Sequence, residues 1–212
     1  MQIIENGLKF VKNFFENECS GHDYFHTLRV FKMAKHIATT EVVNEELVML
    51  VALLHDVDDI KISPATHKNK DNARNFLISN NVEENTINLI CDIISEISYK
   101  GKDSIPAKTL EGKIVQDADR LDALGAIGIA RAFAYGGSKN RVMHDPDELP
   151  TLNMSDEEYR NHVSTTINHF YEKLFNLKDL MNTSCAKAIA ISREAYMKEF
   201  LDEFFEEWDG IK

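Results

Sequence analysis

The sequence is poor in the residues that interrupt or crosslink a chain. Its 212 residues include four prolines, nine glycines and three cysteines, all of them scattered. No stretch has the proline, glycine or polar content of a disordered linker, so we expect a single domain over residues 1–212. The cysteines Cys19, Cys91 and Cys185 form no CxxC pair, which argues against a disulfide framework and a thiolate zinc site. We expect reduced, mostly buried thiols.

The sequence also lacks a long hydrophobic run and an excess of positive charge. No apolar run approaches the roughly 20 residues that a membrane-spanning helix needs, and charged and apolar positions alternate over residues 1–18. We therefore expect a cytoplasmic protein without a membrane partner. Its net charge of −11 would repel a nucleic-acid backbone, which disfavours large nucleic acids as partners. A small phosphate compound remains compatible, because a bound cation can reverse the local potential.

Most of the chain shows apolar residues at helical spacing, and alternating β-branched runs are almost absent. This pattern predicts an all-α fold. The polar stretch 138–154, with two prolines, is expected to be a surface loop, and whether it forms a lid stays open. The expected helices cover about residues 3–18, 24–39, 45–56, 68–80, 84–98, 110–135, 156–176 and 183–208.

A histidine and an aspartate, His55 and Asp56, end the very apolar segment LVMLVALL. Burial makes charge costly there unless something compensates it, and a metal ion would do so at the negative end of a helix dipole. Alternatively, His55 donates to a carbonyl and Asp56 caps a neighbouring backbone, which is the preferred reading of the dipeptide alone. Other residues of ligand type favour the metal site. They are His26, Asp117, Asp119 and Asp122.

Three segments carry a resemblance to a known family. They are GHDYFHTLRV, ALLHDVDD and EGKIVQDADRLDALGAIGIARAFAYGG, in this order. The sequence resembles the HD-domain metal-dependent phosphohydrolases, whose pattern is a histidine, an HD pair and a later aspartate. It is most similar to a single-domain bacterial branch of nucleotide (dNTP) pyrophosphohydrolases, which also shows TTINHFYEKLFNLKDLMNT. The resemblance implies an HD-type helical bundle with a central metal site, a metal-binding core at about 20–135 and C-terminal helices at about 155–208.

The resemblance implies His26, His55, Asp56 and Asp119 as the ligands of a divalent metal ion. Two imidazoles and two carboxylates suit manganese, magnesium, cobalt, nickel or iron, with positions left for water and a phosphate oxygen. Asp122 is an open substitute for Asp119, because the two lie about 60° apart around a regular helix.

The resemblance also implies that Asp59, three residues after Asp56, orients or deprotonates the attacking water. We expect Asp58 to face solvent. His22 precedes the first ligand histidine by four residues, so it could share its helix face and contact a phosphate. Lys100 and Arg120 could neutralise a phosphate chain, although solvated surface cations are an equal alternative. The remaining histidines, expected to be structural or exposed, are His36, His67, His144, His162 and His169.

The resemblance implies hydrolysis of a phosphate ester or anhydride. The substrate that it favours is a deoxynucleoside triphosphate, which is cut to the monophosphate and pyrophosphate. One alternative is a 5′-nucleotidase or other phosphomonoesterase acting on nucleoside monophosphates. The alternative from another class is a non-catalytic module that binds a nucleotide or a metal. A homodimer stays open.

Overall fold

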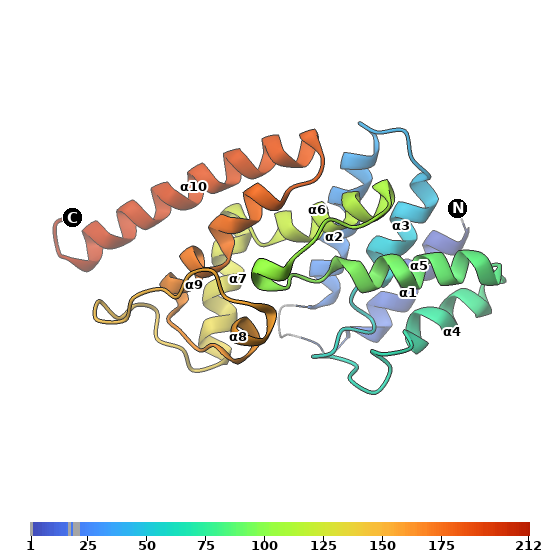
Figure 1. Ribbon diagram of the computed structural model, residues 1–212, viewed down its shortest axis with the longest axis horizontal. Coiled ribbons are helices and arrows are strands. Elements are labelled where there is room, and N and C mark those ends of the chain that lie inside the picture. The colour runs from blue at the N-terminus through green and yellow to red at the C-terminus, as the bar shows by residue number, and fades with distance from the viewer. Residues whose placement is uncertain (1, 17, 19–21) are drawn as a thin grey trace. The chain divides into compact units, whose positions relative to one another are not determined.

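The computed structural model describes every residue of the chain except 1, 17 and 19–21. The described residues form helices and loops without a strand, which confirms the predicted all-α fold (Figure 1). They divide into two compact units: the first consists of Met1–Tyr99 and Ser104–Asp119, the second of Lys100–Asp103 and Arg120–Lys212. The expected single domain therefore stays a prediction. None of the described helices combines the length and apolar character needed to cross a membrane.

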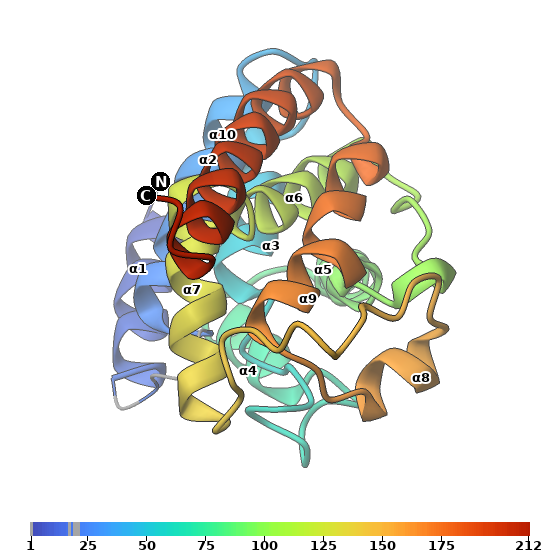
Figure 2. The ribbon, with the colours of Figure 1, turned by 90° about the vertical axis from the view of Figure 1, so that its left-hand side faces the viewer.

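The first unit is built around one apolar helix, α3 (Glu45–Leu54). Asn44 caps this helix by accepting a hydrogen bond from the Leu47 amide at 3.1 Å. From residue 50 to residue 58 every residue is buried, and α3 packs against α1, α2 and α5. Figure 2 shows α2 alongside α3. The other helices of this unit are α1 (Gln2–Phe14), α2 (Tyr24–Ala38), α4 (Asp71–Ser79), α5 (Glu84–Ile97) and α6 (Leu110–Asp122), the last up to Asp119.

The second unit is organised by the C-terminal helix α10 (Ser184–Trp208), which packs against α7 and η2 (Figure 2). The aromatic rings of Phe133 on α7, Phe170 on α9, and Phe200 and Phe204 on α10 pack against one another. Its other elements are η1 (Gly101–Asp103), α7 (Gly125–Ser138), α8 (Asp156–Asn161), α9 (Thr166–Glu172) and η2 (Leu174–Leu180).

Two expected helices are wrong because each is divided into shorter helices. The helix expected over 110–135 is divided into α6 and α7, because Gly125 adopts a φ of +72° that interrupts a right-handed helix. The helix expected over 156–176 is divided into α8, α9 and η2. Thr165, inside the expected helix, caps α9 by accepting the Asn168 amide at 3.0 Å, and so begins a new helix.

The polar stretch 138–154 is mostly loop, as expected, and hydrogen bonds tie it to α9. Asn168 donates to the Glu148 carbonyl at 2.8 Å, and the Thr151 amide donates to Glu172 Oε1 at 3.1 Å. Cys91 is buried and Cys185 half-buried, both as free thiols, while the prediction for Cys19 falls outside the described residues.

Candidate metal centre

Three helices of the first unit bring the four expected ligands together. His26 lies in the first turn of α2, His55 and Asp56 directly follow α3, and Asp119 lies on α6. Asp23 fixes the start of α2 because its carboxylate accepts the His26 amide at 2.7 Å. The apolar character of α3 buries the HD pair, so the ring of His55 lies inside the unit.

The donor atoms of these residues converge on one point. The Nε2 atoms of His26 and His55 are 3.4 Å apart, and they lie 3.2 and 3.3 Å from Asp56 Oδ2. Asp119 Oδ1 completes the cluster at 3.5 Å from His26 and 4.0 Å from His55. Ligands at right angles around a divalent ion, each at about 2.1 Å, would be roughly 3 Å apart. The four residues therefore fit a divalent metal ion.

The orientation of His55 follows from its second ring nitrogen. Its Nδ1 lies 2.9 Å from the Ala52 carbonyl, which can only accept, so Nδ1 carries the hydrogen. The lone pair of a neutral His55 is then on Nε2, which faces the cluster. Fixing a ligand histidine through its other nitrogen is a usual feature of metal sites.

The electrostatics of the cluster favour positive charge at its centre. The His26 and His55 side chains are only 1% and 2% exposed. Burial lowers the pKa of His55, but Asp56 and Asp119 outweigh it and raise the pKa to about 9. Burial likewise raises the pKa of Asp56, but His55 and His22 hold it well below its usual value. A field that holds a proton on His55 also favours a cation between these groups.

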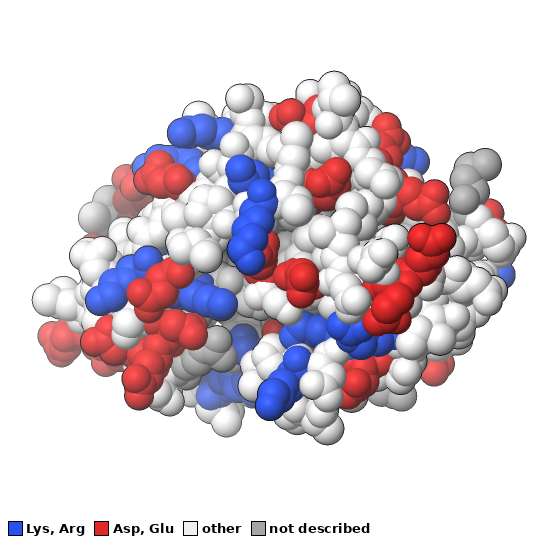
Figure 3. Space-filling model, turned by 45° about the vertical axis from the view of Figure 1, so that its right-hand side comes forward, with Lys and Arg blue, Asp and Glu red and all other residues white. Residues whose placement is uncertain are grey.

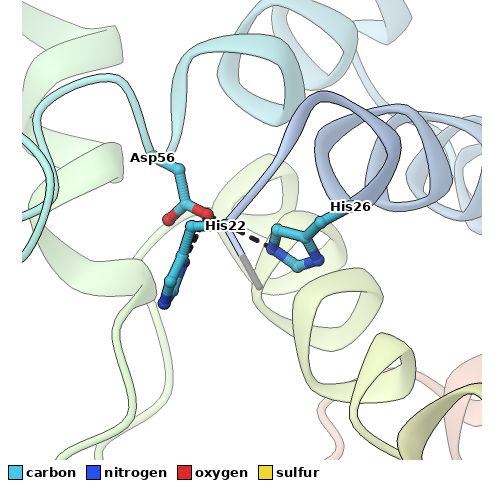
Figure 4. A group of neighbouring side chains, drawn as sticks. All are labelled: His22, His26 and Asp56. Carbon is cyan, nitrogen blue, oxygen red and sulfur yellow. Dashed lines mark hydrogen bonds and ion pairs between the residues drawn. The ribbon is translucent and has the colours of Figure 1, made fainter. Parts of the chain in front are cut away.

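His22 lies at the edge of the cluster and contacts Asp56, one of the four expected ligands. Its Nδ1 is 2.8 Å from Asp56 Oδ2, and its side chain is 25% exposed. Figure 4 shows His22 and His26 pointing toward the same carboxylate of Asp56. The sequence suggested a phosphate contact for His22 and did not indicate this carboxylate contact. Its contact with phosphate stays a prediction.

The two aspartates that the sequence left interchangeable have different surroundings. Asp119 faces the histidines, whereas Asp122 is buried and accepts Arg131 Nη1 at 2.7 Å in the second unit. An aspartate already paired with a guanidinium has less capacity to bind a metal ion. Of the two aspartates, only Asp119 lies in the cluster among the described residues, and its role as the fourth ligand stays a prediction.

The loop after the HD pair corrects one expectation. Asp58 is 1% exposed and does not face solvent. Its carboxylate accepts the amides of Asn72 at 3.1 Å and Ala73 at 3.0 Å, because the first amides of α4 need acceptors from outside the helix. Sequence reasoning missed this role, since Asp58 and α4 are separated by a long loop.

Asp59, the expected catalytic residue, is half-buried and accepts the Lys61 amide at 2.9 Å. Within the described part of the chain its carboxylate makes no hydrogen bond to the cluster. Its catalytic role therefore stays a prediction.

The two expected phosphate-binding cations belong to the second unit. Lys100 is half-buried beside η1, and its carbonyl accepts the Asp103 amide at 2.9 Å. Arg120 is 4% exposed and donates to the Leu180 carbonyl, so the alternative of a solvated surface cation is wrong for Arg120. Their contacts with phosphate stay predictions.

The chain is similar to known proteins of one family. The model of the HD domain family matches residues 23–124, which include all four residues of the cluster. Bacillus subtilis YpgQ, described only as an uncharacterized protein, is 32% identical over 204 residues, covering 95% of this chain and 92% of YpgQ. Its structure in complex with ADP has a TM-score of 0.74 at 29% identity, with 97% of this chain and 100% of that chain covered.

Two further solved structures are similar along their whole length. A Lactobacillus plantarum protein has a TM-score of 0.87 at 39% identity, covering 99% of this chain and 98% of that chain. An HD-superfamily hydrolase from Bacillus thuringiensis has a TM-score of 0.75 at 44% identity, covering 98% and 97%. With the HD family match and these relatives along nearly its full length, the chain belongs to the HD superfamily.

Proposed function

We propose that this protein is a divalent-metal-dependent phosphohydrolase that acts on nucleotides. The specific reaction that we propose is cleavage of a deoxynucleoside triphosphate to the monophosphate and pyrophosphate. The observation that carries the proposal is the convergence of two histidine Nε2 atoms and two aspartate oxygens, with separations of 3.2 to 4.0 Å. This donor set is suited to an octahedral ion that also binds oxygen ligands.

His26, His55, Asp56 and Asp119 would hold the metal. A divalent ion bound there would polarise a phosphoryl oxygen and lower the pKa of water. The chain's own residues hold the site ready: the Ala52 carbonyl fixes the ring of His55, and His22 binds Asp56 Oδ2. Asp59 would orient the attacking water or take its proton.

The nucleotide as substrate is supported by a relative and by charge. YpgQ has been solved with ADP, a nucleoside carrying a phosphate chain, and YpgQ is similar to 95% of this chain. On the face drawn in Figure 3, acidic and basic side chains alternate in small groups. A large nucleic acid would favour a continuous basic surface. The mixed charges of this face (Figure 3) therefore disfavour a large nucleic acid, which leaves a small nucleotide as the substrate.

The test is turnover of nucleoside mono-, di- and triphosphates, in ribo and deoxy forms, with added Mn²⁺. We expect triphosphates to yield monophosphate and pyrophosphate, separated by anion-exchange chromatography. The variants His55→Ala and Asp56→Ala should lose at least about a hundredfold in kcat, because each removes a ligand. His36→Ala, an exposed histidine on α2, is the matched control and should keep wild-type turnover.

Each other outcome identifies a different function. Orthophosphate released from monophosphates would replace the proposal with a 5′-nucleotidase. A metal-dependent rise in melting temperature without any turnover would indicate a binding module. Unchanged turnover in both ligand variants would refute the metal-centred mechanism.

A further inference from the structure

Lys70, at the start of α4, has a backbone conformation that its side chain disfavours. Its φ and ψ are 59° and 43°, the left-handed region that glycine and asparagine visit most readily. The residue is also only 7% exposed, so most of its side chain is removed from water. Burial lowers the pKa of Lys70, and nearby Asp58 and Asp59 oppose that shift. Neither the left-handed backbone nor the burial favours a lysine at this position, so its side chain should have a specific role.

The backbone around Lys70 resembles the glycine-favouring end of a helix. The amides of Lys70 and Asp71 both donate to the Thr66 carbonyl, at 2.8 and 3.4 Å, which is the pattern of a left-handed C-terminal cap. At the other end of α4, Asn81 has a φ of 58°, and the Val82 amide donates to the Leu77 carbonyl at 3.1 Å. Asn81 is exposed, so it provides a matched backbone without the buried charge.

The side chain of Lys70 closes the loop that begins at the HD pair. Its Nζ donates to the His67 carbonyl at 2.7 Å, and His67 Nδ1 lies 2.8 Å from the Asp58 carbonyl. A second set of contacts joins the same segments through Asn72, whose side chain donates to the Val57 carbonyl at 2.9 Å and to Thr66 Oγ1 at 3.0 Å. Lys70 is therefore linked through His67 to the carbonyl of Asp58, the residue that precedes Asp59.

We propose that Lys70 is a positioning residue, whose ammonium group holds loop 57–70 so that the Asp59 carboxylate keeps the orientation that catalysis needs. This inference rests on the proposed function. The competing explanation is that Lys70 only satisfies the last carbonyl of a short helical turn and so stabilises the fold. Lys70→Gly removes the backbone strain and the ammonium group together. The positioning role predicts a lower kcat for this variant, whereas a purely structural role predicts an unchanged kcat.

Four variants separate them: Lys70→Met, Lys70→Gly and Lys70→Arg, with Asn81→Gly as the control for backbone relaxation. If Lys70 positions Asp59, Met and Gly at position 70 should both lower kcat by about 10- to 100-fold, with KM within about threefold of wild type. Lys70→Arg should recover most of the loss, and Asn81→Gly should leave kcat unchanged. Lys70→Gly should still fold, because glycine relieves the left-handed backbone. Wild-type kcat in Lys70→Gly would overturn the proposal.

Hydrogen exchange of the metal-free protein gives a readout that does not depend on activity. The Lys61 amide donates to the Asp59 carboxylate at 2.9 Å and the Ser63 amide to the Asp59 carbonyl at 2.8 Å, so both report on this loop. We expect both amides to exchange at least about tenfold faster in Lys70→Gly than in Asn81→Gly, with α5 unchanged. Unchanged exchange at residues 61–63 would overturn the proposal even in an active enzyme. Faster exchange in a protein without turnover would support the positioning and refute the proposed function.

Discussion

At the scale of single residues, the position of His55 is compatible with both interpretations of the HD pair. Its Nδ1 donates to the Ala52 carbonyl, as the purely structural interpretation requires, and its Nε2 faces the cluster, as the metal interpretation requires. Both are possible because His55 follows the last residue of α3, where carbonyls lack helical partners. The position at the end of the helix therefore orients the ring of His55 toward the cluster.

Asp119 and Asp122 should respond differently to the same substitution. Asp119→Asn should weaken Mn²⁺ binding at least about tenfold, because it removes a carboxylate that faces both histidines. Asp122→Asn should leave Mn²⁺ affinity unchanged and lower stability by about 1–3 kcal/mol, because it breaks the pair with Arg131. Calorimetric Mn²⁺ titration and urea unfolding measure the two effects. The reverse pattern would exchange the roles of the two aspartates.

At the scale of elements, the spacing of apolar residues predicted continuous helices such as α10. It did not predict helix ends that lie inside an apolar segment. The helix expected over 183–208 matches α10 closely. The segment 110–135 looked continuous because its apolar spacing continues across Gly125. Gly125 has a positive φ, and a Cβ added there would meet the Arg193 side chain at 3.0 Å. Asp58 could not be placed either, since its partners Asn72 and Ala73 are neighbours only after the loop folds.

The buried acid of α10 gives a pH-dependent prediction. Glu194 is buried, with Lys178 Nζ at 2.8 Å and Lys198 Nζ at 2.5 Å. Burial would raise the pKa of Glu194, but its hydrogen bonds with the two lysines lower it below the usual value. A lowered folded-state pKa contributes stability above the unfolded pKa of about 4.3, and this stability is lost as the pH falls through the folded-state pKa.

We therefore expect Glu194→Gln to cost about 1–2 kcal/mol at pH 7, measured by urea unfolding. The difference from wild type should stay constant down to about pH 5 and shrink below about pH 4. Glu199→Gln, an exposed acid on the same helix, should change stability by less than about 0.5 kcal/mol. A Glu194→Gln effect that persists unchanged in acid would contradict the account.

At the scale of the whole molecule, the candidate site is assembled within the first unit from distant segments. The four expected ligands were inferred from a resemblance, and the structure brings all four residues together. Sequence spacing could not predict which groups gather around them: His22 joins Asp56, whereas Asp59 hydrogen-bonds locally and Lys100 and Arg120 belong to the second unit. Such placement depends on helix packing, which no local pattern encodes.

The most direct test of the metal centre is calorimetric titration of the metal-free protein with Mn²⁺. We predict about one ion bound per chain, and at least about a hundredfold weaker binding in His55→Ala, because the lost imidazole faces the other three ligands. His36→Ala should bind like wild type. Wild-type affinity in His55→Ala, or no Mn²⁺ binding by the unaltered protein, would contradict the assignment of these residues as a metal site.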